Sequence, residues 1–174
     1  MKKTSNVTIS ISRNAFNTNE VLHDIQLGVI RPNAISWAAE NGYTEIAKSL
    51  INLGANINEN SNYPLELSCK NGHTEIVRML IEAGAKPSTS HDKDYCLRIA
   101  AFHGYTAIVK LLLNAGANPL ANDYCALSLA LNGGYMDVVE LLINSICQIR
   151  TSINANTPIE RKSYKKGKEE KRNR

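Results

Sequence analysis

Aliphatic residues recur at helical spacing in four segments of the chain. In each segment an isoleucine or valine is followed, four and five residues later, by two more aliphatic residues. This spacing places all three on one side of a helix, and it predicts an amphipathic helix with a buried stripe. The four stripes are Ile46-Leu50-Ile51, Ile76-Leu80-Ile81, Ile108-Leu112-Leu113 and Val138-Leu142-Ile143.

A shorter apolar segment, rich in small residues, precedes each stripe. These segments cover residues 34–39, 65–69, 97–101 and 127–131. The chain therefore alternates a short first helix with an amphipathic second helix, four times over.

Glycines divide these helices at a fixed period. One set lies in the turn between the two helices of a unit, at intervals of 30, 32 and 30 residues: Gly42, Gly72, Gly104 and Gly134. A second set follows twelve residues after the first three and suits a left-handed residue that ends the second helix: Gly54, Gly84 and Gly116.

The residues after the first set of glycines also recur. Thr44, Thr74 and Thr106 stand where the second helices begin, and we expect their hydroxyls to cap the free N–H groups of the first turn. Tyrosines 43, 105 and 135 recur in the same turns, where we expect them to pack along the outer edge of the repeats.

A recurrence of about 30 to 33 residues is typical of a solenoid, in which each unit buries its apolar face against its neighbours. The predicted fold class is therefore all-α: a solenoid of stacked helix-turn-helix units joined by short hairpin loops.

The recurring residues resemble the ankyrin repeat, whose unit runs T-P-L-H-x-A-A-x-x-G-H-x-E-I-V-x-L-L-L-x-x-G-A-D. The resemblance covers three full units and a degenerate fourth, over about residues 33–147. It implies an ankyrin-repeat solenoid that binds a protein partner at its hairpin tips and at the exposed end of its first helices. The abundance of asparagine is similar to that of ankyrin proteins of giant DNA viruses or of intracellular bacteria, which implies a host protein as the partner.

The chain departs from this pattern where the family has T-P-L-H. Asn33-Ala34-Ile35-Ser36 stands there in the first unit, and none of the later units has the full motif. The hydrogen bonds that the family's Thr and His make between neighbouring turns are therefore missing, which puts the stability of the stack in doubt. Glu66 and Arg98 occupy equivalent positions in adjacent units, and we expect them to form an inter-repeat pair that replaces part of this link.

These patterns divide the chain into four parts. Residues 1–17 form an N-terminal arm, and residues 18–32 form a divergent cap with Val21, Leu22 and Ile25 facing the first repeat. The repeats occupy residues 33–150, as units of about 33–62, 63–94, 95–124 and 125–150. In the last unit Ile146-Cys147 replaces Gly-Ala, so we expect its second helix to run on toward Arg150. Residues 151–174 form a basic, disordered tail.

Charge is distributed unevenly between these parts. Residues 1–147 carry 11 Lys/Arg and 13 Asp/Glu, whereas residues 148–174 carry 9 and 3. The net charge of +4 therefore arises from the tail, which indicates an import signal, a clamp for nucleic acid or anionic lipid, or a solubilising end. Its basic cluster is Arg161, Lys162, Lys165, Lys166, Lys168, Lys171 and Arg172.

Composition excludes several classes of protein. No apolar run approaches the roughly 18–20 residues that span a bilayer, and no signal or lipidation motif is present. The four cysteines are widely spaced, as expected of reduced thiols in the cytoplasm or nucleus, or in the host cytoplasm if the protein is viral. No phosphate-binding loop or hydrolase motif occurs, so we expect no cofactor and no enzymatic activity.

Two cysteine–histidine arrangements bear on this expectation. His91, Cys96, His103 and Cys125 lie in or beside the third unit, but their spacing matches no standard zinc site. A Cys96–His103 nucleophile pair lacks a nearby orienting acid. We expect structural cysteines and neither a metal site nor a catalytic site.

The candidate partner-binding residues also belong to the third unit. Phe102 stands at a position that is solvated in such repeats, and an aromatic side chain there is typical of interface hot spots. The hairpin that leads into this unit is two residues longer than its neighbours. The predicted contact patch is His91, Asp92, Lys93, Tyr95, Phe102 and His103. The alternative is that Phe102 folds over an apolar edge and the loop is only longer.

We therefore predict a monomeric, non-enzymatic scaffold that binds another protein through the concave face of the solenoid. The alternative is a nuclear or nucleic-acid-associated factor led by its basic tail.

Overall fold

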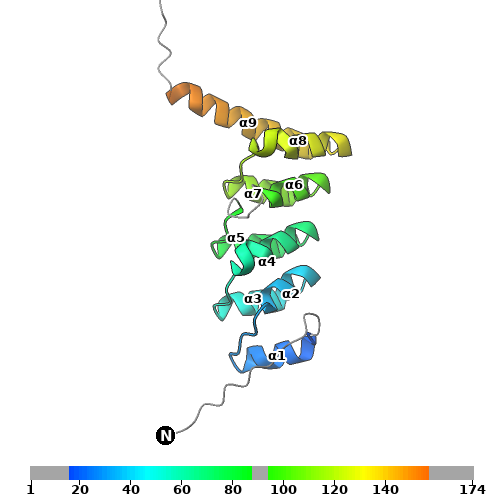
Figure 1. Ribbon diagram of the computed structural model, residues 1–174, viewed down its shortest axis with the longest axis vertical. Helices are drawn as coiled ribbons and strands as arrows, with labels where there is room; N and C mark the ends of the chain where they lie inside the picture. The colour runs from blue at the N-terminus through cyan, green and yellow to red at the C-terminus, as the bar shows by residue number, and fades with distance from the viewer. Residues whose placement is uncertain (1–15, 88–93, 157–174) are drawn as a thin grey trace, which may run out of the picture.

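The computed structural model describes residues 16–87 and 94–156 of the 174-residue chain (Figure 1). In these ranges every regular element is helical, which confirms the predicted all-α class. The helices are α1 (Thr18–Gln26), α2 (Ala34–Asn41), α3 (Thr44–Asn52), α4 (Glu59–Lys70), α5 (Thr74–Glu82), α6 (Tyr95–Phe102), α7 (Thr106–Asn114), α8 (Ala121–Gly133) and α9 (Met136–Asn156).

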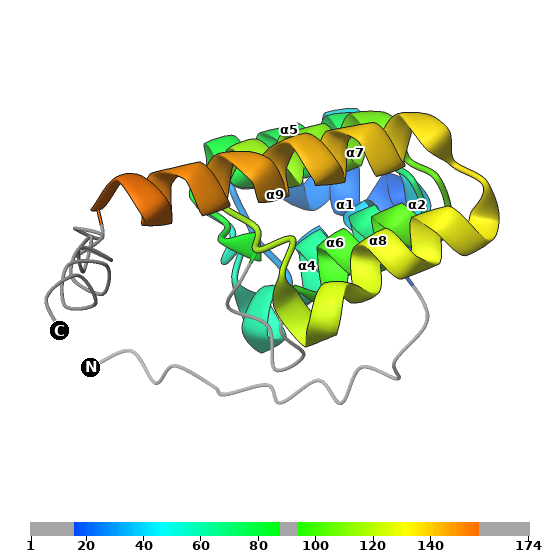
Figure 2. The same cartoon turned by 90° about the horizontal axis from the view of Figure 1, so that it is seen from above.

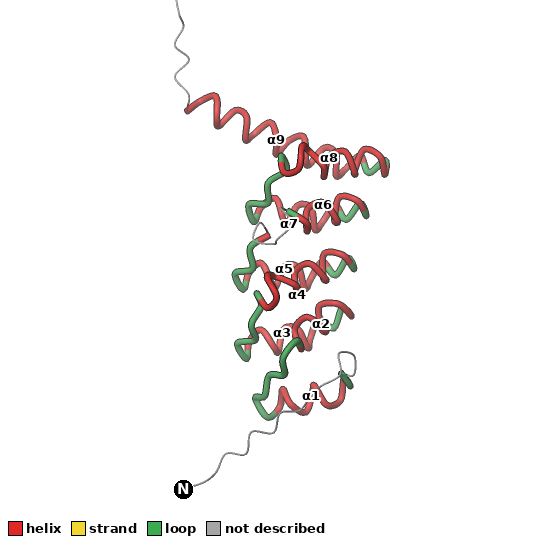
Figure 3. The backbone as a smooth tube through the Cα atoms, viewed as in Figure 1, coloured by secondary structure: helices red, strands yellow, loops and turns green. Residues whose placement is uncertain are grey.

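The helices stack as antiparallel pairs along one axis (Figure 1). The first helices α2, α4, α6 and α8 pack on one another in one layer, and the second helices α3, α5, α7 and α9 form the other (Figure 2). Helix α1 packs on α3 as α3 packs on α5, so it extends the layer of second helices. The turns within pairs lie along one edge of the stack, and the connections between pairs lie along the other (Figure 3).

The predicted stripes form the core, with one exception. The first two residues of every stripe are at most 6% exposed, from Ile46 and Leu50 to Val138 and Leu142. The third residues, Ile51, Ile81 and Leu113, are partly buried against the core. Ile143, expected to be buried like them, is instead 45% exposed, because no described unit follows α9 to cover it.

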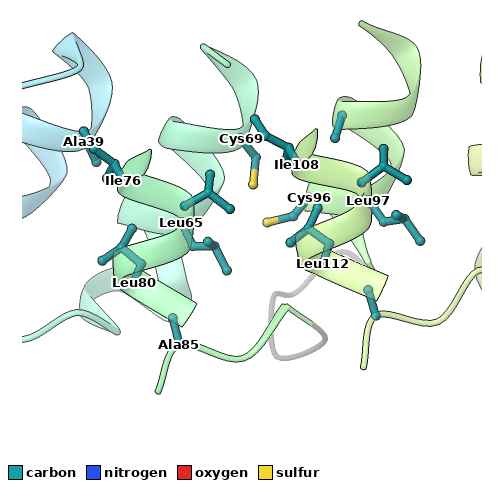
Figure 4. Close-up of a cluster of buried hydrophobic side chains, with 14 of the residues drawn as sticks. Ala39, Leu65, Cys69, Ile76, Leu80, Ala85, Cys96, Leu97, Ile108 and Leu112 are labelled. Atoms are coloured by element: carbon teal, nitrogen blue, oxygen red, sulfur yellow. The ribbon is translucent and has the colours of Figure 1, made fainter. Parts of the chain in front are cut away.

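The short first helices bring small residues into the interface between units. Ala39, Cys69 and Ala101 occupy equivalent positions and are completely buried. In Figure 4 the Cys69 thiol of α4 points toward the Cys96 thiol of α6. The small side chains at this position therefore allow the next unit to pack closely.

The glycines act as predicted, and one set has a second role. Gly54, Gly84 and Gly116 follow second helices with φ of 86°, 102° and 87°, a left-handed conformation. Gly72 is also left-handed, and a Cβ atom added to it would lie 2.9 Å from Cζ of Tyr105 in the next unit. His73 and Tyr135 cover Gly42 and Gly104 in the same way. The recurring rings therefore pack along the edge of the stack, as expected, and each rests on the glycine of the preceding unit.

The predicted threonine caps are wrong. The N-cap residues of α3, α5 and α7 are Tyr43, His73 and Tyr105, and none makes a side-chain cap hydrogen bond. The Thr44 hydroxyl donates to the carbonyl of Gly42 at 3.4 Å, and Thr106 donates to Gly104 in the same way. Because threonine is already the first helical residue, its hydroxyl lies beyond the position from which a cap accepts.

Other side chains link the units where the family motif is absent. Glu59, the first residue of α4, accepts hydrogen bonds from the backbone N–H of Ser36 at 3.1 Å and from the Ser36 hydroxyl. This carboxylate caps the start of α2 in the preceding unit. Buried Asn62 donates to the carbonyl of Lys86 at 3.0 Å, and buried Asp94 accepts from the N–H of Asn118 at 3.1 Å. Successive connections are therefore tied together by residues other than the expected Thr and His.

The two ends of the stack differ from the predicted boundaries. In the cap, Val21 is buried as expected, but Leu22 is 43% exposed. Phe16 covers the first unit instead, with its ring centroid 5.3 Å from that of Trp37. At the other end, α9 continues past Arg150 to Asn156, so residues 151–156, assigned to a disordered tail, are helical. The basic cluster beyond them lies outside the described residues.

Candidate functional site

The candidate site is built on α6, the first helix of the third unit. Tyr95, Arg98 and Phe102 are three and four residues apart on this eight-residue helix, so they lie along one side of it. The Arg98 guanidinium carbon lies 5.9 Å from the centroid of the Tyr95 ring, within the range of a cation–π contact. The helix is held in the stack by its other side, where Cys96, Leu97 and Ala100 are buried.

Phe102 is the most distinctive residue of this surface. It is 52% exposed. The equivalent positions in the other units carry Glu40, Lys70 and Asn132, all exposed and polar. A large apolar side chain at a position that is otherwise polar offers surface that a partner can cover.

A row of aromatic rings packs against Phe102. The Phe102 and His103 rings meet edge to face, with centroids 4.9 Å apart. His103 stacks in turn on Tyr105, with centroids 5.3 Å apart and an interplanar angle of 21°. Tyr105, at the other end of the row, packs over Gly72 of the preceding unit, and this contact holds its ring in place. Contacts with the neighbouring rings therefore restrict the Phe102 side chain, in addition to its own rotamer preference.

The structure places half of the predicted patch. Tyr95 and Phe102 are the first and last residues of α6, and His103 follows directly and contacts Phe102. His91, Asp92 and Lys93 lie outside the described residues, so their part in the patch stays a prediction. Sequence reasoning missed Tyr105 as the support of this site. The signal was present, because a ring follows the turn glycine in every unit.

The predicted pair of Glu66 and Arg98 lies between neighbouring first helices. Both side chains are half-buried, on α4 and α6, and these helices pack directly on each other. Their equivalent positions are compatible with a link between the second and third units. The pairing itself stays a prediction.

The cysteines of this region belong to the core. Cys96 is 1% exposed and faces Cys69, whereas His103 is exposed at the other end of α6. Burial, followed by the hydrogen bond with Cys96, raises the pKa of the Cys69 thiol well above its ordinary value. A thiol with a raised pKa stays protonated at neutral pH and is a poor nucleophile. In the described part of the chain, no three His, Cys, Asp or Glu residues are grouped so as to hold a metal ion.

The described helices also offer no membrane-spanning segment. None of them is both long and apolar enough to cross a bilayer, α9 included.

Comparison with known families gives two matches along the chain. A family model of three ankyrin repeats matches residues 10–91, and a model of a single ankyrin repeat matches residues 92–124. The matches thus begin within the segment assigned to the N-terminal arm and end before α9, although α8 and α9 continue the same stack. A search of the curated proteins found no match.

Proposed function

Because this chain belongs to the ankyrin repeat family, we propose that it is a non-enzymatic scaffold that binds another protein through the surface of its first helices. Ankyrin repeats are in general modules of protein–protein interaction. In this chain the surface of α6 is the proposed centre of binding, and the exposed ring of Phe102 carries the proposal.

The mechanism is recognition by a preorganised surface. Phe102 is supported by two further rings and by a helix whose opposite side is buried, so little side-chain entropy is lost when a partner covers it. Aromatic side chains dominate the energy of many interfaces, whereas the polar residues around them contribute mainly complementarity. A host protein as the partner belongs to the same proposal through the asparagine-rich composition of the repeats. A cytoplasmic or nuclear location belongs to it through the widely spaced cysteines.

Proximity labelling in cells tests this proposal when intact protein is compared with a Phe102→Ala variant. We expect the variant to lose labelling of a defined set of proteins, because the loss of one hot-spot ring costs about 2 kcal/mol or more, roughly a 30-fold loss of affinity. Lys70→Ala is the matched control, since it truncates the equivalent exposed position of the preceding unit. Equal labelling by intact protein and Phe102→Ala, with both folded, contradicts the proposal.

The alternative, a nuclear or nucleic-acid-associated factor led by the basic tail, is separated by a truncation after Asn156. This cut removes the tail cluster and leaves α9 complete. If the first-helix surface binds the partner, the truncated chain keeps its labelled set. Loss of the set on truncation, with Phe102→Ala unchanged, would favour the tail.

A further inference from the structure

The last unit leaves one end of the stack uncovered. Leu131 of α8 occupies the position of Ala39, Cys69 and Ala101, which are completely buried, yet it is 53% exposed. Gly134 shows the same difference, because a Cβ atom added to it meets nothing within 4 Å. The equivalent glycines of the three earlier units are each covered by a ring.

The Cys69 position shows which way this uncovered surface faces. Its thiol points toward that of Cys96 in the following unit, so the equivalent Leu131 faces the place where a following unit would lie. Ile143 of α9 lies on the same open end, since its counterparts in α3, α5 and α7 are partly buried. Terminal units of solenoids normally carry a polar outer surface. Here the surface is apolar.

Helix α9 carries an exposed stripe that includes Ile143. Met136, Glu140, Ile143, Cys147 and Arg150 follow one another at spacings of four, three, four and three residues, and all five are exposed. This alternation of three and four residues keeps side chains on one side of a helix and is the spacing of paired helices. The helix is also long: it spans 21 residues, whereas α3, α5 and α7 span 9 each, and it extends past the stack (Figure 2).

The stripe is complementary to itself when two copies run antiparallel. A twofold axis between Ile143 and Cys147 places Ile143 of each copy against Cys147 of the other. The same axis places Glu140 of each copy against Arg150 of the other. Apolar residues then meet apolar residues and acids meet bases, as an isologous interface requires.

We propose that a second copy of this chain covers the open end, through antiparallel contact of the two α9 stripes with Leu131 at the margin. The contact continues the packing between repeats across a twofold axis. Because each copy uses the same surface, assembly stops at a dimer. The sequence predicts a monomer in solution, and this proposal replaces that expectation.

Sedimentation equilibrium of the full chain, from about 1 to 100 µM, tests the proposal. We expect a monomer–dimer equilibrium in this range. Glu140→Arg and Arg150→Glu should each raise the dimer dissociation constant by about tenfold, because each change creates two like-charge pairs across the axis. The double variant E140R/R150E restores both pairs with reversed sign and should return the constant to within about threefold of the starting value.

Two controls show whether a change in the dimer comes from the α9 contact. Lys110→Glu changes the charge at the α7 position equivalent to Glu140, away from the open end, and should leave the dimer unchanged. Arg150 also donates a hydrogen bond to the Tyr124 hydroxyl at 3.2 Å, so circular dichroism must show that each variant is folded.

Cross-linking gives a second, independent readout of the same contact. A thiol-specific cross-linker should join two chains through exposed Cys147, and Cys147→Ser should abolish this product.

Three results would overturn the proposal. A single-chain mass over the whole range would leave the open end to a different occupant. A dimer that responds equally to Lys110→Glu and Glu140→Arg would be held by general electrostatics and not by α9. A folded E140R/R150E variant as weak as the single variants would exclude the antiparallel register.

Discussion

At the scale of single residues, side chains that differ from the repeat pattern determine the chemistry of this molecule. Glu59 caps the preceding first helix, and buried Asn62 and Asp94 hold the connections of the following units. Phe102 replaces a polar residue and creates the candidate contact. The repeat pattern accounts for the stacking of the helices. The residues that depart from it supply the hydrogen bonds between units and the candidate binding surface.

Cys69 makes stability depend on pH in a predictable direction. Its thiol has a raised pKa in the folded state because of burial, so above about pH 8.5 the unfolded thiol loses its proton while the folded thiol keeps it. Unfolding then releases a proton, and the free energy of unfolding falls as pH rises. Urea denaturation under reducing conditions between about pH 7 and 10 should show a steeper fall for the intact chain than for Cys69→Ala.

Cys69→Ala is a well-matched variant, because alanine fills the equivalent positions at Ala39 and Ala101. Lysines and tyrosines titrate in both proteins, so the difference between the two curves reports Cys69. Parallel curves would show that burial does not perturb this thiol.

At the scale of elements, each junction between units combines helix packing with a ring resting on a glycine. Gly72→Ala should therefore destabilise more than Gly54→Ala. Both residues are left-handed, with φ of 77° and 86°, so both variants incur backbone strain of about 1–2 kcal/mol. Only the added Cβ of Gly72 would meet a ring, that of Tyr105, whereas Gly54 has nothing within 4 Å. Chemical denaturation should show a further loss of about 1–2 kcal/mol for Gly72→Ala.

Tyr105→Ala supplies the control for this comparison. It removes the ring that the new methyl group would strike, so Gly72→Ala should cost less in that background. Equal costs for Gly72→Ala and Gly54→Ala would mean that the ring shifts freely.

Much of the architecture at this scale is predictable, because helix ends and core positions depend on local sequence. The spacing of Ile46 and Leu50 and the left-handed glycines locate helices and core without tertiary information. The spacing fails at Leu22 and Ile143, which depend on whether a neighbour exists to cover them. Phe102 could likewise be identified as an aromatic at a polar position, and the ring that follows every turn glycine was a sequence signal for Tyr105. The contact of Tyr105 with Gly72 is not visible in the local sequence, because it joins two different units.

At the scale of the whole molecule, the main contacts between the described helices join neighbours in the stack, so we expect stability to vary along it. Helix α1 packs mainly on α3 and buries one residue, Val21, whereas α4 and α6 are covered on both sides. Hydrogen exchange measured by mass spectrometry should therefore show the slowest exchange in α4 and α6 and the fastest in α1.

Hydrogen exchange also tests the C-terminal end of the stack. The C-terminal half of α9 extends beyond the stack, so it should exchange faster than the N-terminal half (Figure 2). Uniform protection along the whole chain would indicate a single cooperative unit and would contradict the gradient.

The rings that rest on glycines have a consequence for how such a chain can change length. Each ring belongs to one unit and its glycine to the unit before, so a duplicated unit brings a ring for the glycine behind it and a glycine for the ring ahead. A segment such as 63–94 therefore carries both halves of the contact and can be copied in tandem without a new joint. The links made by Glu59, Asn62 and Asp94 use different side chains in different units. The contacts that permit duplication thus lie along the edge formed by the turns within pairs. The links that differ between units lie along the edge formed by the connections between pairs.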